Sequence, residues 1–443
     1  MPLPRLLLIA YALPALPLAA LTLPLYIIVP TFYSETLGLS LASVGAALLV
    51  VRIFDAVNDP LIGWLADRWR PAMGRRRAAT LAALPLCALG ALMVFWPPAG
   101  AGTAHLVLWA MVLSIGYTGA VLPLSAWGAE LAGGYAERSR VAGYREGFTL
   151  AGTLVAIAVP FAIGMESGDG LHGLAVLGIA VAVLVVAFGA FTVWRVPEPR
   201  EHSRTRLSLR AGLAAMAANR PFLRLVAAFL INGLANGIPA TLFLYFVSDV
   251  LGAPEMRGPL LFVYFLAGVA GVPLALAAAA RLGKHRAWCL AMMATCAVFV
   301  FAPFLGEGDV WLFAAISVAT GLTLGFDLAL PAAIQADVID VDTAASGEQR
   351  SGVYFAAWSL ATKSALALAV GIAFPLIGAF GFVPGAAAND ATALAALAWT
   401  YAWLPIVLKL AAVGLMWNFP LDEAAQAALR GRIVSGAAAS GSG

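Results

Sequence analysis

The stretch VVRIFDAVNDPLIGWLADRWRP, residues 50–71, decides the fold. It is mostly apolar, yet it places Arg52, Asp55 and Asp59 within one short segment. A charged side chain at the centre of a bilayer costs about 2.5 kcal/mol or more, so such residues are rare in membrane helices and mark functional sites. The stretch therefore predicts a membrane-spanning helix that carries a buried charged site.

The composition of the whole chain also indicates a membrane protein. Of its 443 residues, 62% are hydrophobic and 11% are charged, whereas soluble proteins have about 25% charged residues. The apolar residues form twelve blocks, each long enough to cross about 30 Å of hydrocarbon as a helix. The blocks are 6–33, 40–66, 78–97, 104–131, 143–164, 171–194, 221–249, 257–280, 286–305, 310–336, 351–378 and 392–418. They lack the alternation of barrel strands, which predicts an all-α membrane protein with twelve transmembrane helices.

The distribution of basic residues predicts the orientation. The block boundaries put 22 of the 26 Lys and Arg residues on one side of the membrane, and loops rich in these residues are cytoplasmic. Both termini are therefore expected in the cytoplasm. The first block is expected to be retained, because no small-residue cleavage site and polar chain follow it. The net charge of +3 follows from this topology and does not indicate nucleic-acid binding.

The longest polar stretch, residues 194–221, divides the chain into two six-helix halves. Two related six-helix bundles are typical of secondary transporters, whose binding sites lie between the halves near the membrane midplane. The expected units are an N-terminal bundle (1–194), a cytoplasmic linker (195–220), a C-terminal bundle (221–420) and a cytoplasmic, partly disordered tail (421–443).

The acidic pair of the opening stretch has the chemistry of a cation site. Asp55 and Asp59 are four residues apart, so they share one helical face with Arg52, and Asn58 is adjacent. Two carboxylates this close need a positive partner in a low-dielectric site. That partner can be Na⁺ or Li⁺, which carboxylate and amide oxygens suit, or a proton, or Arg52. The alternative is a structural salt bridge of Arg52 with one aspartate, which leaves the other acid without a partner.

Several motifs resemble a known family. Gly63-x-x-x-Asp67-Arg68 followed by Gly74-Arg75-Arg76 resembles the helix 2–3 signature of the major facilitator superfamily. DAVNDPLIGWLADR, GAELAGGYAERSRVAGYR, QADVIDVDTAASGEQRSGVYFAAWS and the final WNFPLDE resemble the glycoside–pentoside–hexuronide:cation symporters, the family of the melibiose carrier. The resemblance extends over the whole chain. It implies Na⁺- or H⁺-coupled symport of a small organic solute by alternating access, in a cell membrane and most simply a bacterial inner membrane.

The resemblance also implies a site. In that family the two aspartates bind the coupling cation with a helix 4 threonine, and Thr118 falls at the matching position. Asp55 and Thr118 are expected about 16 and 20 Å from the cytoplasmic end, so they can meet. Lys363 matches a lysine beside the cation site, and Arg145 is close to an arginine that faces the sugar.

Substrate recognition departs from the family pattern. The two acidic residues that hold sugar hydroxyls in the family correspond to Ala19 and Val121, which are apolar. A simple galactoside is therefore not expected, and an amphipathic, anionic or lipid-like solute remains open.

Other polar residues inside the apolar blocks are candidates for substrate binding or coupling. Asp327, Lys363 and Lys409 are expected at similar depth in helices 10, 11 and 12, which predicts an ion pair or a triad. A lysine left over can bind an anionic substrate or move to Asp55 when the cation leaves. The remaining candidates are Arg52, Arg145, Tyr117, Asn232 and Asn236. The two asparagines can line the cavity opposite Asp55, and the alternative is hydrogen bonding between helices in the core.

Charged residues at the cytoplasmic helix ends are expected to form an inner gate. They are Asp67, Arg68, Arg75, Glu130, Asp337 and Asp340.

Other functions remain as alternatives. The same acids suit a proton-coupled exporter, and a membrane sensor or assembly factor would be a non-transport function. An intramembrane enzyme is disfavoured, because the sequence has neither HExxH nor GxSxG. The expected partners are a small-molecule substrate and membrane lipids, with no nucleic acid and no cofactor beyond the coupling cation. Cys87, Cys289 and Cys296 lack metal-ligand spacing, and a monomer is expected.

Overall fold

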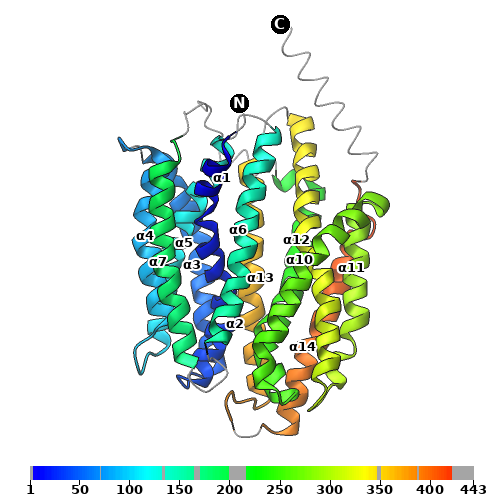
Figure 1. Ribbon diagram of the computed structural model, residues 1–443. Helices are drawn as coiled ribbons and strands as arrows, with labels where there is room; N and C mark the ends of the chain where they lie inside the picture. The colour runs from blue at the N-terminus through cyan, green and yellow to red at the C-terminus, as the bar shows by residue number, and fades with distance from the viewer. Residues whose placement is uncertain are drawn as a thin grey trace.

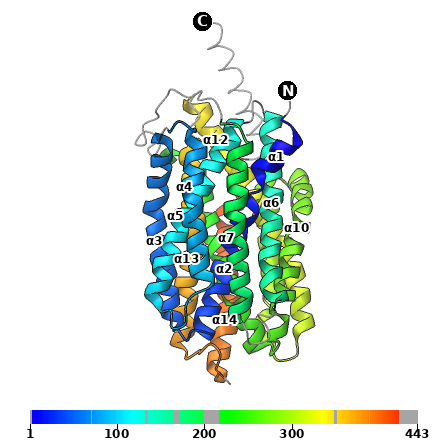
Figure 2. The same ribbon diagram turned by 60° about the vertical axis from the view of Figure 1, so that its left-hand side comes forward.

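The computed structural model describes residues 3–69, 71–131, 135–163, 170–198, 216–346, 351–386 and 389–421. Every regular element in these ranges is a helix. The elements are α1 (Arg5–Ala12), α2 (Ala15–Glu35), α3 (Leu41–Arg68), α4 (Arg75–Phe95), α5 (Thr103–Leu131), α6 (Tyr135–Ala162), α7 (Gly170–Arg195), α9 (Arg220–Tyr245), η1 (Phe246–Val250), η2 (Pro254–Met256), α10 (Arg257–Leu282), α11 (Lys284–Phe299), η3 (Ala302–Phe304), α12 (Val310–Ser346), α13 (Ser351–Ala379) and α14 (Ala391–Met416). Figures 1 and 2 show the long helices side by side along a common axis.

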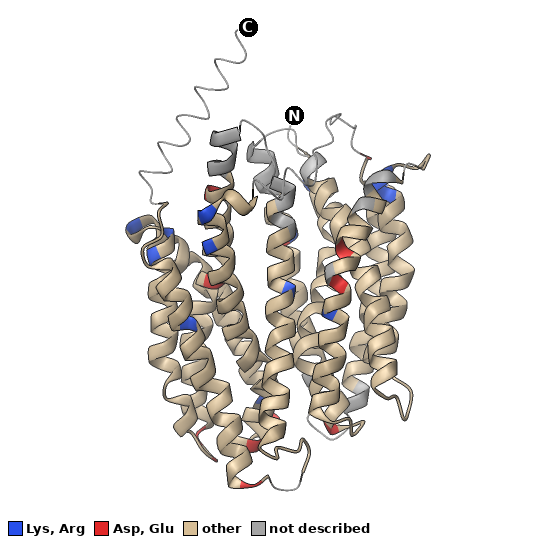
Figure 3. Ribbon diagram, turned by 180° about the vertical axis from the view of Figure 1, so that it is seen from behind, with Lys and Arg blue, Asp and Glu red and all other residues tan. Residues whose placement is uncertain are grey.

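Eleven helical stretches of the described residues are long and apolar enough to cross a membrane. α6 is not among them, although it has 28 residues, because charged residues such as Arg145 and Glu146 occupy its first half. The twelve-helix count and the cytoplasmic termini therefore remain predictions. α1 begins and α14 ends at the same end of the bundle (Figure 1). Most Lys and Arg residues lie toward that end, and a few charged residues lie along the middle parts of the helices (Figure 3).

The first apolar block is divided, where one continuous helix was expected over 6–33. α1 ends at Ala12 and α2 starts at Ala15, with Pro14 at its N-cap. Proline lacks a backbone N–H and clashes with the preceding turn, which explains the break. Pro24 and Pro30 lie within α2, and Pro60 lies within α3. Membrane helices tolerate such prolines because neighbouring groups satisfy the freed backbone atoms.

Glycines bring particular helices into close contact. A Cβ at Gly116 of α5 would collide with the backbone of Cys87 in α4. On α10, a Cβ at Gly271 would collide with the backbone of Leu322 in α12. Small residues allow this close approach, which drives helix association where the lipid removes the hydrophobic driving force.

The helices pack mainly within two groups, which we call the N-terminal helices (α1–α7) and the C-terminal helices (α9–α14). Three pairs of helices make the principal contacts between the groups. They are α3 with α13, α6 with α10, and α2 with α9. A polar contact between two of these six helices therefore depends on how the two groups are arranged.

Candidate functional site

The first charged centre forms around Asp55 on α3. Its side chain is fully buried, and it accepts hydrogen bonds from the Arg52 guanidinium and the Ser114 hydroxyl. The Arg52 guanidinium also lies 4.5 Å from the centre of the Tyr26 ring. Arg52 is on the same helix, three residues before Asp55, whereas Ser114 comes from α5. Ser114 was not among the sequence candidates, because a serine in an apolar helix is an ordinary residue.

Asp59 extends this centre toward the C-terminal helices. It accepts a hydrogen bond of 2.8 Å from Thr118 on α5 and another from the ammonium of Lys363 on α13. Lys363 Nζ also lies 3.4 Å from Thr118 Oγ1 and 3.9 Å from Asp55 Oδ2. With Arg52, the two carboxylates thus have two cationic partners. The structure brings together Arg52, Asp55, Asp59, Thr118 and Lys363, as the sequence analysis expected.

Asn58 lies beside this centre with an unused polar group. The side chain is buried, and its Nδ2 has no hydrogen-bond partner among the described residues. The nearby oxygens of Asp55, Asp59, Ser114 and Thr118 belong to the carboxylate and hydroxyl groups that hard cations prefer. The donor set therefore fits a small cation, in the place where Lys363 now contacts Asp59.

Two neighbouring cavities lie at the first centre. A cavity of about 250 Å³, which we call the cation-site cavity, is lined by Arg52, Asp59, Thr118 and Lys363. A central cavity of about 630 Å³ lies next to it, since Thr22, Tyr117 and Val121 line both. The central cavity is large enough for a small organic molecule.

The wall of the central cavity is strongly asymmetric. Its polar and charged groups all come from the N-terminal helices, including Arg145, which donates to Ser125 at 3.1 Å and pairs with Glu146 at 2.8 Å. Ala19 and Val121 also lie on this wall. The lining residues from the C-terminal helices are all apolar: Phe265, Val269, Val272, Leu324, Leu328 and Ala329. The positions that carry acidic residues in the resembled family thus face the cavity with apolar side chains.

A second charged centre lies within the C-terminal helices. Asp327 on α12 is 3.5 Å from Lys409 on α14. The carboxylate also accepts hydrogen bonds from Asn232 (2.9 Å), Asn236 (2.8 Å) and Trp288 (2.6 Å). Lys409 in turn donates to Asn232 at 2.8 Å.

Of the pair or triad expected for Asp327, Lys363 and Lys409, the structure forms the pair of Asp327 with Lys409. Lys363 lies at the other centre, because the rotation of α13 turns it toward α3. Asn232 and Asn236 join helices through the Asp327 carboxylate and do not face Asp55.

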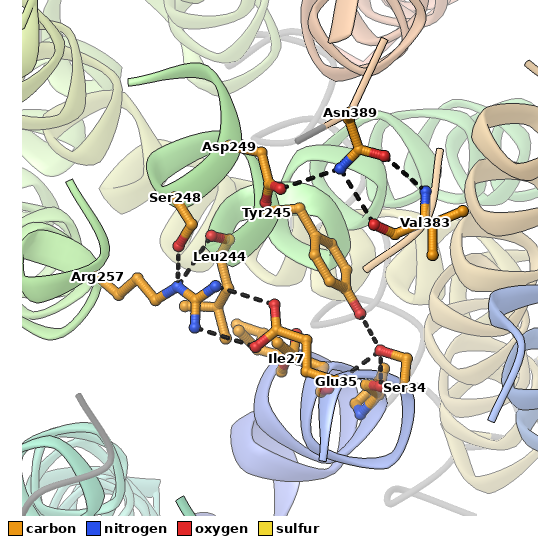
Figure 4. Close-up of polar contacts among 12 residues, drawn as sticks. Ile27, Ser34, Glu35, Leu244, Tyr245, Ser248, Asp249, Arg257, Val383 and Asn389 are labelled. Carbon is orange, nitrogen blue, oxygen red and sulfur yellow. Dashed lines mark hydrogen bonds and ion pairs between the residues drawn. The ribbon is translucent and has the colours of Figure 1, made fainter. Parts of the chain in front are cut away.

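A third cluster joins the end of α2 to α9 and to the start of α10 (Figure 4). Glu35, at the end of α2, accepts two hydrogen bonds from Arg257 of α10, at 2.9 and 3.2 Å. Next to it, the hydroxyls of Ser34 and Tyr245 are 2.6 Å apart. These contacts join N-terminal to C-terminal helices. The sequence offered one signal for them, because Arg257 is the single basic residue that the block boundaries place on the side opposite the expected cytoplasmic one.

The expected inner-gate residues are only partly described. Asp337 accepts a hydrogen bond of 2.5 Å from Lys284, so this pair joins α12 to α11 within the C-terminal helices. Arg75 is the first residue of α4, next to a turn in which Glu198 accepts from the backbone N–H groups of Arg76 and Arg77. The side chains of Asp67, Arg68, Glu130 and Asp340 lie outside the described residues.

Comparison with solved structures supports the fold. The crystal structure of the nucleoside transporter NupG superposes with a TM-score of 0.64 over 94% of this chain and 98% of NupG, at 14% identity. A bacterial homologue of the lysosomal transporter Spinster, in an inward-facing and unoccupied conformation, superposes with a TM-score of 0.64 over 97% of this chain and 96% of that one, at 15% identity. At these identities the similarity concerns the fold alone.

Sequence comparison relates the chain to transporters. The isoprimeverose transporter of Lactiplantibacillus pentosus is 26% identical, over 87% of this chain and 82% of the relative. The glucuronide carrier protein homologue of Escherichia coli is 23% identical, over 89% and 87%. A sodium-dependent lysophosphatidylcholine symporter of Xenopus tropicalis is 22% identical, over 89% and 81%.

The family model described as MFS/sugar transport protein matches residues 10–423, almost the whole chain. The many membrane helices and the bacterial relatives make the chain a multi-pass bacterial membrane protein. Its family consists of transporters that bind small molecules, and not of enzymes. The chain belongs to the MFS/sugar transport protein family, among relatives that are symporters of sugars and glycosides.

Proposed function

We propose that the protein is a cation-coupled symporter in which Na⁺ and the Lys363 ammonium alternate at Asp59. The observation that carries this proposal is the contact of Lys363 with Asp59 between α13 and α3. Each aspartate has a positive partner in this arrangement, so the centre is electrically balanced without a bound ion. A cation that enters among the carboxylate and hydroxyl oxygens replaces the ammonium and restores the same balance.

This exchange couples ion binding to the arrangement of the helices. The ion pair lies between α3 and α13, which form a principal contact between the two helix groups. When a cation replaces Lys363 at Asp59, that electrostatic link between the groups is lost. The cation therefore changes the relative stability of the two arrangements, which is the requirement for a ligand to shift a conformational equilibrium. H⁺ can act in the same way by protonating Asp59.

The transported solute binds in the central cavity. That cavity adjoins the cation-site cavity, since Tyr117 and Val121 line both, so solute and cation occupy neighbouring spaces. Binding of one then strengthens binding of the other by the same factor, typically about 5- to 150-fold. The relatives named for sugars and glycosides and the relative named for lysophosphatidylcholine suggest solutes with a polar head. The apolar lining favours a solute that also has a substantial apolar part.

The cluster of Glu35 and Arg257 supports alternating access. It joins the two helix groups at the end opposite the start of α1 (Figures 1 and 4), so the solute has to enter the central cavity from the other end in this arrangement. A rigid movement of the N-terminal helices relative to the C-terminal helices would break the contacts of that cluster and close the other end. This movement would complete the transport cycle.

Thermal unfolding of the purified protein in choline, Na⁺ and Li⁺ at several pH values tests this function without knowing the solute. We expect Na⁺ to stabilise the parent and to have no effect on Asp55→Asn and Asp59→Asn. A stability that depends on pH through these aspartates, without any effect of Na⁺, would make H⁺ the coupling ion. If neither ion matters and both variants behave like the parent, cation coupling at this site is wrong.

A further inference from the structure

The second charged centre opens onto a small cavity of its own. This cavity, about 60 Å³ in volume, lies among the C-terminal helices, and its polar lining includes Asn236, Ser317, Tyr264, Asp327, Tyr401 and Lys409. About 10–15 Å³ of such cavity volume already holds a water molecule, so the space admits a group of several hydroxyls. The transport function proposed above assigns no role to these residues.

The charges at this cavity are already balanced. Asp327 is paired with Lys409, and its carboxylate also accepts from two asparagines and a tryptophan. The side chains of Asp327 and Lys409 are 12% and 5% exposed, respectively. A buried pair of this kind would be disrupted by a ligand with a net charge, because one partner would then lose its counter-ion. The cavity therefore suits an uncharged polar group.

Two buried hydroxyls in the cavity lack partners. Tyr401 and Ser317 are each 3% exposed and both line the cavity, and no hydrogen bond joins either hydroxyl to another described residue. The two hydroxyls therefore open onto the cavity and are available to a ligand. A ligand hydroxyl can donate to or accept from these groups, and an analogue without the hydroxyl cannot.

The small cavity adjoins the central cavity. Phe265 and Leu324 line both. On the central side, the wall formed by the C-terminal helices is entirely apolar. A molecule that spans the two cavities therefore meets hydrogen-bonding groups at one end and, along the rest of its length, the apolar wall of the C-terminal helices on one side.

We propose that the small cavity binds the hydroxyl-bearing end of an uncharged amphipathic solute, such as an aryl or alkyl glycoside, whose apolar part lies in the central cavity. This inference rests on the proposed function in one respect, that the solute uses the central cavity. It places the polar recognition in the C-terminal helices, at Tyr401, Ser317 and the Asp327–Lys409 pair. The apolar part then lies against the apolar wall of the C-terminal helices, with Ala19 and Val121 of the N-terminal helices as its apolar contacts on the other side.

Equilibrium binding to the purified full-length protein in lipid nanodiscs tests the inference. The probe is 4-nitrophenyl-β-glucoside, measured by isothermal titration against glucose, 4-nitrophenol and 4-nitrophenyl phosphate. We expect the glycoside to bind more tightly than each of the other three, since only it combines uncharged hydroxyls with an apolar ring. Tighter binding of the phosphate or of 4-nitrophenol, or no measurable binding of the glycoside, would overturn the proposal.

Two variants locate the contact. Tyr401→Phe and Ser317→Ala each remove one hydroxyl and should weaken glycoside binding about 3- to 10-fold, as expected for one lost hydrogen bond. Their thermal unfolding without the probe should match the parent, because neither hydroxyl has a partner in the protein. Tyr33→Phe is the matched control, since the Tyr33 hydroxyl donates to Val94 and lines neither cavity. Unchanged glycoside binding in both cavity variants would place the head group elsewhere and overturn the proposal.

The same titrations distinguish this inference from the proposed cation coupling. Asp59→Asn should still bind the glycoside in choline, and Tyr401→Phe should still respond to Na⁺ in thermal unfolding. If Na⁺ has no effect on the parent while Tyr401→Phe weakens glycoside binding, the solute site stands and cation coupling fails. The reverse pattern would retain the cation site and reject the solute site.

Discussion

The ammonium of Lys363 on α13 donates a hydrogen bond to the carboxylate of Asp59 on α3, although the two residues are 304 positions apart in the chain. Lys363 Nζ is also within 3.9 Å of Asp55. One side chain from the C-terminal helices thus balances an acidic pair on the N-terminal helices. This relationship makes the acidic pair sensitive to how the two helix groups are arranged, and several measurements follow from it.

Lys363→Met should distinguish the effect of the Lys363 ammonium on stability from the effect of a bound Na⁺. We expect a loss of about 1–3 kcal/mol in the free energy of unfolding in choline. The loss is smaller than for a fully buried pair, since the two side chains are 17% and 21% exposed. Stabilisation by Na⁺ should increase, because the competing ammonium is gone. Thermal unfolding in choline and in Na⁺ measures both effects.

Lys409→Met is the matched control for that experiment. It removes a lysine from the other charged centre, where Lys409 pairs with Asp327. We expect lower stability in both salts and a Na⁺ response equal to that of the parent. An equal change in the Na⁺ response of the two variants would contradict competition at Asp59.

Ser114→Ala should weaken cation binding. The Ser114 hydroxyl donates to the buried carboxylate of Asp55, and hydrogen bonds to charged groups contribute about 1.5–3 kcal/mol. We therefore expect the Na⁺ concentration for half-maximal stabilisation to rise at least roughly 10-fold. Ser359→Ala is the control, since Ser359 lines the same cavity without a hydrogen bond to either aspartate. Equal effects of the two substitutions would exclude a specific role for Ser114.

Glu35→Gln should favour opening of the end at which Glu35 contacts Arg257. It removes the carboxylate that accepts two hydrogen bonds from Arg257. With side chains 16% and 21% exposed, we expect the loss of about 1–2 kcal/mol, which shifts the population of the open form roughly 5- to 30-fold. Spin labels on Trp96→Cys and Phe304→Cys, both exposed in the parent, would report longer distances by pulsed electron paramagnetic resonance.

The control for this measurement is Glu255→Gln, which changes an exposed acid of η2 close to Arg257 in sequence. The three native cysteines are buried and would be replaced by alanine in all samples. Distances that are the same in Glu35→Gln and in Glu255→Gln would show that the Glu35–Arg257 pair does not hold this end closed.

Gly116→Ala should destabilise the contact between α4 and α5. The added Cβ would collide with the backbone of Cys87, which cannot rotate away. Overpacking of this kind costs about 1–3 kcal/mol. The control is Gly414→Ala on α14, where the Cβ meets nothing within 4 Å. That substitution should leave stability unchanged or raise it by up to about 1 kcal/mol, because alanine favours helix. Thermal unfolding of the two variants side by side measures the difference, and a Gly116→Ala variant as stable as Gly414→Ala would contradict the close contact.

The local sequence pattern was sufficient to predict the helices and the helix face that carries the two aspartates of the site. The apolar blocks predict the membrane spans, because each helix has to cover the hydrocarbon thickness with its own residues. Asp55 and Asp59 lie on one face because their spacing is a property of a single helix. Pro14 is the local signal for the break between α1 and α2, and the apolar character of the block concealed it.

Pairing between helices was decided only by the tertiary structure. Hydropathy places Lys363, Lys409 and Asp327 at similar depth, and depth alone allows either lysine to pair with the aspartate. The rotation and register of each helix select Lys409 for Asp327 and Lys363 for Asp59. Those rotations depend on close contacts such as Gly237 of α9 against Ala369 of α13. Packing between other helices brings Ser114 to Asp55 and Glu35 to Arg257. The sequence by itself thus determined which residues are buried and charged, because burial follows from one helix in lipid. Which of them meet depends on the packing of many side chains at once, and this only the folded bundle decides.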